Sequence, residues 1–141
     1  MDRVLKAHFD SHRTIGSLPP ELEGFSGRLF PDLEKLSVWR NAVKGLSMEH
    51  EGMKFKGALD DLFQTPENLY VPVDFKTRGY PIKEDTPKSY QLQMDCYSLL
   101  LEKNSLPPAG FAILLFYHPL KVNASHNVEF HAQPVKIKTS P

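Results

Sequence analysis

The chain has 141 residues, a length that suits one domain built around one hydrophobic core. Lysine and arginine together number 17, equal to aspartate and glutamate, and this balance argues against a protein that coats nucleic acid through bulk positive charge. No apolar run approaches the ~20 residues that a membrane-spanning helix needs, and a single cysteine, Cys96, excludes an intrachain disulfide and a cysteine-bound zinc site. With no signal-peptide pattern at the start, we expect a cytoplasmic protein without membrane contact.

The first part of the chain predicts two helices separated by a loop. Residues 4–13 place apolar and histidine side chains at helical spacing. Residues 16–31 are rich in proline and glycine and predict an irregular segment, and residues 33–43 predict a second, short helix.

The middle of the chain changes to strand-like alternation. Residues 54–63 and 69–77 each alternate apolar side chains, and residues 64–68 between them contain Pro66 and predict a turn. The two segments therefore predict a β-hairpin, and residues 78–88 predict an exposed loop after it.

The last part of the chain predicts the strongest helix, over residues 88–103, and two further strands over residues 109–118 and 128–138. The order of elements predicts an α/β (α+β) fold in which helices flank a mixed central sheet, in a single domain over residues 1–141.

Asp74 and Lys76 lie two residues apart on the second of the hairpin strands, so their side chains should share one face of the sheet. Phe75 should point to the opposite, apolar face with Val71 and Val73. Alone, an Asp-x-Lys pair is more often an acid–base pair on a solvated strand than a functional site.

Asp60, on the preceding strand, can lie beside Asp74 across the hairpin. Two neighbouring carboxylates repel each other unless a cation lies between them, and Mg²⁺ prefers such oxygen ligands. The alternative is an aspartate pair that faces water at a strand end. Asp61 rather than Asp60 shares the strand parity of Phe55 and Leu59, so a bulge would decide which aspartate faces the metal.

Gln93 falls within the apolar arc of the predicted helix, where a buried amide without a partner costs about 1–3 kcal/mol. Tyr97, four residues later, would reach the same place. The partner of Gln93 is either a backbone group of the core or a residue of an active site.

Taken together, Gly57-Ala58-Leu59-Asp60, then Asp74-Phe75-Lys76, then Gln93 and Tyr97 on a helix, resemble the PD-(D/E)xK nuclease superfamily, in particular its RecB-like exonuclease branch. The resemblance covers less than half of the chain. It implies a restriction-endonuclease-like αβββαβ core and a DNA nuclease that depends on Mg²⁺ or Mn²⁺, acting in DNA repair, recombination or defence, with a helicase or another DNA-processing protein as a partner.

The resemblance also implies roles for single residues. Asp60, Asp74 and the Phe75 carbonyl would bind the metal, Lys76 would act on the attacking water, and the following residues would position it or contact DNA: Gln93, Tyr97, Thr77 and Arg78. His8 is a candidate for the further upstream ligand found in this branch, although a surface histidine is the more ordinary explanation. One cysteine cannot hold the iron–sulfur cluster of some relatives. The competing reading is an inactive relative that binds nucleic acid or a protein partner.

Overall fold

The computed structural model describes residues 2–122 and 128–139 of the chain. In these residues the helices are α1 (Asp2–Ile15), α2 (Leu33–Arg40) and α3 (Gln91–Lys103), with 3-10 turns η1 (Pro20–Leu22) and η2 (Thr86–Tyr90). The strands are β1 (Arg28–Leu29), β2 (Leu46–His50), β3 (Met53–Gly57), β4 (Asp61–Gln64), β5 (Tyr70–Thr77), β6 (Phe111–Val122) and β7 (Val128–Lys138).

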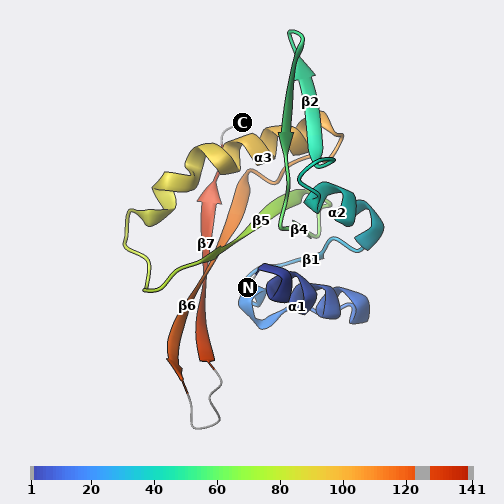
Figure 1. Ribbon diagram of the computed structural model, residues 1–141. Helices are drawn as coiled ribbons and strands as arrows, with labels where there is room; N and C mark the ends of the chain where they lie inside the picture. Colours follow the sequence, from blue (N-terminus) through green and yellow to red (C-terminus); the bar gives the residue numbers. More distant parts are fainter. Residues whose placement is uncertain (1, 123–127, 140–141) are drawn as a thin grey trace.

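A five-stranded mixed sheet forms the centre of the molecule, in the order β1-β4-β5-β6-β7. β5 and β6 are parallel, and the other neighbouring strands are antiparallel. α1 lies over one face of this sheet and α3 over the other (Figure 1). The predicted mixed α/β fold class is confirmed.

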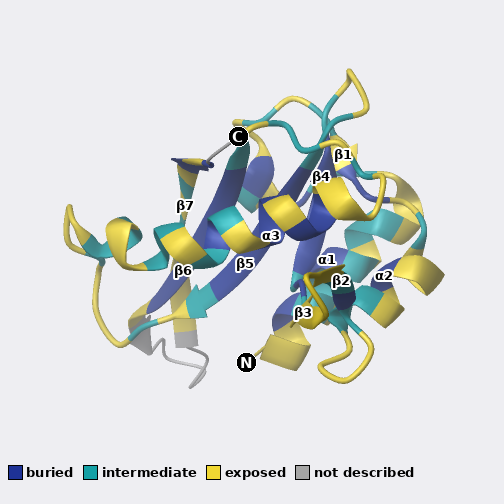
Figure 2. Cartoon of the chain, turned by 90° about the horizontal axis from the view of Figure 1, so that it is seen from above, coloured by how far each residue is buried: buried dark blue, intermediate teal, exposed yellow. Residues whose placement is uncertain are grey.

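Each face of the sheet has its own apolar core. Leu5 and Phe9 of α1 pack against Val71, Val73 and Phe75 of β5. The opposite core, against α3, consists of buried residues from several elements: Leu36, Leu59, Met94, Tyr97, Leu101, Leu114 and Phe116. Figure 2 shows the buried strands beneath the exposed outer side of α3. The predicted alternation of β5 is thus confirmed, because its apolar residues face α1 while Asp74 and Lys76 fall on the face of α3.

The predicted strand over residues 54–63 does not run straight. It breaks after Gly57, and β3 leaves the central sheet to pair with β2 as a separate hairpin. The break is anchored to α2, because the Leu59 amide donates a 3.0 Å hydrogen bond to the Trp39 carbonyl and the Leu59 side chain is buried. Only β4 and β5 form the predicted hairpin within the central sheet, with Asp61 opposite Val73.

Two smaller differences concern the other end of the chain. Residues 86–90 form a 3-10 turn, so α3 begins at Gln91 rather than at residue 88. β7 continues through Pro134, which a strand at the edge of a sheet tolerates because its outer amides need no ladder partner.

Within the described part of the chain, none of the helices has the length and apolar character needed to cross a bilayer.

Candidate active site

Asp60 and Asp74 converge at the break between β3 and β4. Asp60 lies directly before β4, and its Oδ2 accepts a 2.8 Å hydrogen bond from the Phe75 backbone amide on β5. The Asp74 carboxyl group lies close enough to act on the pKa of Asp60. The side chain of Asp74 is only 5% exposed and that of Asp60 is 19% exposed, so water screens their charges weakly.

The pKa of Asp60 is raised to about 7, first by burial and then by the hydrogen bond and negative charge of Asp74. The amide hydrogen bond from Phe75 opposes the rise. Near neutral pH the protonated form of Asp60 is therefore well populated, and a cation beside the carboxyl group would favour the ionised form. The arrangement therefore favours binding of a positive ion between two carboxylates.

Lys76 supplies the positive group nearest to this pair. Its Nζ lies 2.6 Å from Asp74 Oδ2 and donates a 3.3 Å hydrogen bond to Gln93 Oε1 on α3. Asp74 Oδ2 is buried, and no donor in the described residues reaches it with hydrogen-bond geometry, although the Lys76 ammonium group is close. This buried oxygen thus has the Lys76 ammonium group as its counter-charge but accepts no hydrogen bond in the described residues.

Gln93 and Tyr97 connect Lys76 to the strand break. Gln93 Nε2 donates to the Tyr97 hydroxyl over 3.1 Å, and that hydroxyl donates to the Ala58 carbonyl over 3.1 Å. Burial, together with the negative charge of Asp74, raises the pKa of Tyr97 to about 12, so its hydroxyl stays protonated and can donate. The predicted polar partner of Gln93 therefore exists, and it includes Lys76 itself.

Tyr90 is a neighbour of the site that sequence analysis did not predict. The Lys76 Nζ lies 4.6 Å from the centroid of its ring, a cation–π distance, and the ring also packs near Phe116. Its position three residues before Gln93 on the same segment was the available signal, because residues at that spacing face the same way.

Asp61 faces the opposite side of the sheet from Asp60. Its carboxylate is fully buried and contacts the guanidinium groups of Arg13 and Arg40. A bulge was the predicted irregularity in residues 54–63, and the structure has a complete break there instead. The break turns Asp60 toward Asp74, whereas Asp61 remains in β4. Sequence analysis did not predict this role of Arg40.

Gly57 is required by the close approach of α3. A Cβ at this position would lie 2.8 Å from Leu100 Cδ1 and 3.1 Å from Tyr97 Cε1.

We expect Gly57→Ala to lower the free energy of unfolding by about 1 kcal/mol, since overpacking displaces these side chains. Chemical denaturation would measure the loss. Gly79→Ala is the control, because its Cβ would meet no atom within 4 Å, and equal stability losses in the two variants would contradict the steric explanation.

The remaining predicted residues lie further from the carboxylate pair. His8 pairs with Glu21, because its Nε2 lies 3.0 Å from Glu21 Oε2. The same oxygen also accepts a hydrogen bond from the Tyr117 hydroxyl. Thr77 is exposed at the end of β5, and the Arg78 guanidinium donates to the Tyr80 hydroxyl over 3.2 Å.

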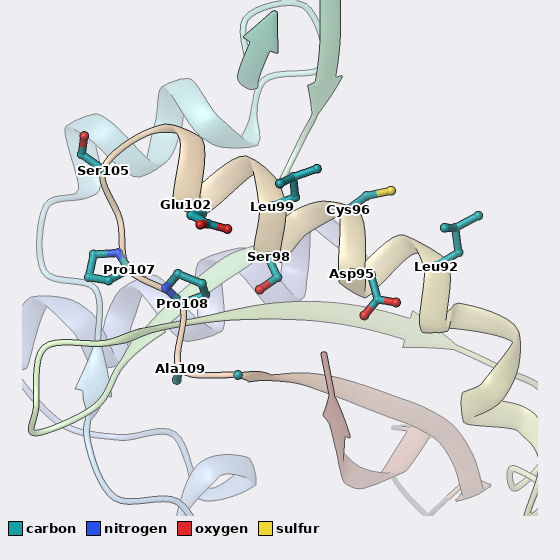
Figure 3. Close-up of a pocket in the computed structure, with 11 residues that line it drawn as sticks. Leu92, Asp95, Cys96, Ser98, Leu99, Glu102, Ser105, Pro107, Pro108 and Ala109 are labelled. Carbon is teal, nitrogen blue, oxygen red and sulfur yellow. The ribbon is translucent and has the colours of Figure 1, made fainter. Parts of the chain in front are cut away.

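A separate pocket lies between α3 and the segment that leads into β6. It is lined by exposed Leu92 and Leu99, by acidic Asp95 and Glu102, and by a proline pair, and Figure 3 shows these side chains along the helix. None of the predicted catalytic residues belongs to its lining, so the pocket is distinct from the carboxylate pair.

The residues present fit a divalent cation. Mg²⁺ is commonly held by one or two carboxylates and completes its shell with water. Asp60 and Asp74 supply two carboxylates, and the buried Asp74 Oδ2 lacks a hydrogen bond within the described residues. A larger cluster of three or more acidic, histidine or cysteine ligands does not occur in residues 2–122 and 128–139.

Comparison with known proteins gives one result. No curated protein and no solved structure matches the chain. The family model of the PD-(D/E)XK nuclease superfamily, however, matches residues 2–138, nearly the whole chain. With the family model covering this length, and with the mixed sheet described above, the chain belongs to the PD-(D/E)XK nuclease superfamily.

Proposed function

We propose that this protein is a Mg²⁺- or Mn²⁺-dependent deoxyribonuclease that hydrolyses phosphodiester bonds. The observation that carries the proposal is the convergence of Asp60, Asp74 and Lys76 at one point of the sheet. Family membership implies a nucleic-acid substrate, and the match over residues 2–138 supports one nuclease-like domain.

In this proposal Asp60 and Asp74 hold the ion, with the Phe75 carbonyl as a further oxygen ligand. When bound, the ion acts as a Lewis acid toward the phosphate and lowers the pKa of a coordinated water. Lys76 orients the attacking water and stabilises the negative charge that develops on the phosphate. Its ammonium group is well suited to this task because Asp74 and Gln93 hold it from two elements.

Gln93 and Tyr97 act as positioning residues for Lys76. The chain of hydrogen bonds from Lys76 through Gln93 and Tyr97 to the Ala58 carbonyl ties α3 to the strand break. This arrangement supports the RecB-like branch as a finer assignment, because Gln93 and Tyr97 are the helix residues on which that resemblance rests. Thr77 and Arg78, at the end of β5, are the proposed contacts to the DNA backbone. A role in DNA repair, recombination or defence, beside a helicase or similar partner, follows from the same assignment.

The test is a cleavage assay with labelled DNA and, in a parallel arm, labelled RNA, in the presence of Mg²⁺ or Mn²⁺. We expect DNA cleavage by the wild type and a loss of about 100-fold or more in Lys76→Ala, because a positioned charged group is lost. Asp74→Ala should also be inactive. Lys103→Ala, at the exposed far end of α3, should cleave like the wild type. Equal cleavage by wild type and Lys76→Ala would refute the assignment.

One observation favours the alternative, a catalytically inactive member that binds nucleic acid or a protein partner. Lys6 Nζ lies 3.7 Å from Asp60 Oδ1 and already places a positive charge beside the proposed metal ligand. We expect calorimetry nevertheless to detect Mn²⁺ binding to the wild type and not to Asp74→Asn. A wild type that binds DNA but no Mn²⁺ would favour the inactive module.

A further inference from the structure

Four charged side chains form a closed ring where α1, α2 and β4 meet. Arg13 contacts Asp10 and Asp61, and Arg40 contacts the same two aspartates from the other side. The two Arg40 contacts span 3.0 Å to Asp10 Oδ2 and 2.9 Å to Asp61 Oδ2. Each arginine thus joins two carboxylates, and each carboxylate joins two arginines.

Three of the four ring side chains are buried, and the Nε of each arginine bonds to a different backbone segment. The side chains of Arg13 and Arg40 are 3% and 10% exposed, that of Asp61 is fully buried, and that of Asp10 is 28% exposed. Arg13 Nε donates to the Phe30 carbonyl over 2.6 Å, whereas Arg40 Nε donates to the Asp60 carbonyl over 2.7 Å. Only Arg40 therefore touches the residue that carries the proposed metal ligand.

The ring holds Asp60 without adding net charge near the proposed metal. The charges of the two arginines and the two aspartates cancel. The ring therefore does not repel a nearby divalent cation as an unpaired guanidinium group would. A buried ion-pair network is also weak evidence for stability alone, because packed apolar residues often serve as well. The hydrogen bond from Arg40 to the Asp60 carbonyl indicates that the ring also positions Asp60.

We infer that Arg40 is a positioning residue of the active site, which fixes the Asp60 backbone so that the Asp60 carboxylate meets Asp74. Two hydrogen bonds then hold Asp60, in addition to its ion pair with Lys6. Arg40 binds its carbonyl oxygen, and the Phe75 amide binds its carboxylate. Since Asp60 lies in the break between β3 and β4, outside the hydrogen-bonded ladder of the sheet, these two contacts limit its movement. The inference rests on the proposed metal-dependent nuclease function.

Arg40→Lys and Arg13→Lys form a matched pair for the test. Both variants keep the positive charge, remove the two-pronged guanidinium geometry and disturb the same ring. They differ in the backbone carbonyl that loses its hydrogen-bond donor. In Arg40→Lys it is the Asp60 carbonyl, and in Arg13→Lys it is the Phe30 carbonyl. Leu36→Ala, a buried apolar change on α2, controls for loss of stability without any change to the ring.

Mn²⁺ affinity of each variant would be measured by calorimetry at a temperature where circular dichroism shows it folded. We expect about 10-fold weaker binding in Arg40→Lys, the magnitude typical of losing a group that orients a metal ligand. Arg13→Lys and Leu36→Ala should stay within about 2-fold of the wild type, although both lose thermal stability. In cleavage assays Arg40→Lys should lower kcat with little change in KM for DNA, and Arg13→Lys should do neither.

Two results would overturn the inference, and they are distinguishable. If the wild type binds Mn²⁺ but Arg40→Lys and Arg13→Lys bind it equally well, Arg40 has only a structural role. If the wild type itself binds no Mn²⁺, the proposed function fails and the positioning role fails with it.

Discussion

Asp61→Asn is expected to lower the free energy of unfolding by about 3 kcal/mol, because it leaves two buried guanidinium groups with one carboxylate between them. Burial raises the pKa of the Asp61 carboxyl and outweighs the opposing charges of Arg13 and Arg40, which contact both of its oxygens. The expected loss therefore comes from the two guanidinium groups that lose their partner, and because asparagine has nearly the same size it does not come from a cavity. Urea denaturation monitored by circular dichroism would measure it.

Asp32→Asn is the matched control for this prediction. Asp32 caps the start of α2 by accepting a 3.1 Å hydrogen bond from the Lys35 amide in an exposed position. Asparagine caps helices about as well as aspartate, so we expect a change below about 0.5 kcal/mol. If Asp61→Asn were no more destabilising than Asp32→Asn, the buried ring would not contribute to stability as described.

Asp60→Asn, one residue earlier, is expected to have the opposite effect on the metal-free protein. The pKa of Asp60 rises from 3.8 to about 7 on folding, so the folded state favours the protonated carboxyl. The stability that this provides is complete below the unfolded pKa and is lost as the pH rises through the folded one. At pH 8 the ionised carboxylate therefore destabilises the wild type, and Asp60→Asn should be more stable by on the order of 2 kcal/mol.

The pH dependence makes this second prediction specific. The advantage of Asp60→Asn should be largest above pH 7 and should disappear below about pH 4, where Asp60 is protonated in both the folded and the unfolded state. Thermal unfolding without added metal across this range would measure it. Adding Mn²⁺ should raise the melting temperature of the wild type but not of Asp60→Asn, because a ligand stabilises only the protein that binds it. A pH-independent difference between the two proteins would contradict the raised pKa.

Opposite effects at two adjacent aspartates would separate a residue of the proposed active site from a residue of the scaffold. A site that holds like charges together without a bound cation is costly for the fold, and removing one charge relieves that cost. Asp61, in contrast, has its charge balanced by Arg13 and Arg40 within the fold.

Local patterns determined much of the site. Alternation along β5 places Asp74 and Lys76 on one face and Phe75 on the other, because successive side chains of a strand point in opposite directions. Helical spacing likewise brings Gln93 and Tyr97 into contact, since residues four apart are neighbours on a helix. These relationships need only the few residues around them, so the sequence was sufficient to predict them.

What the tertiary structure alone decided is which way Asp60 and Asp61 face, and what holds them there. Strand parity left open which of the two aspartates faces the metal. In the structure the Leu59 amide bonds to the Trp39 carbonyl, and Arg40 of α2 bonds to the Asp60 carbonyl. These contacts join residues about twenty positions apart, and their partners become neighbours only when the helices pack on the sheet. The pairing of His8 with Glu21 has the same origin. Periodicity encodes the faces of single elements, whereas breaks in a strand and long-range ion pairs depend on how the elements pack.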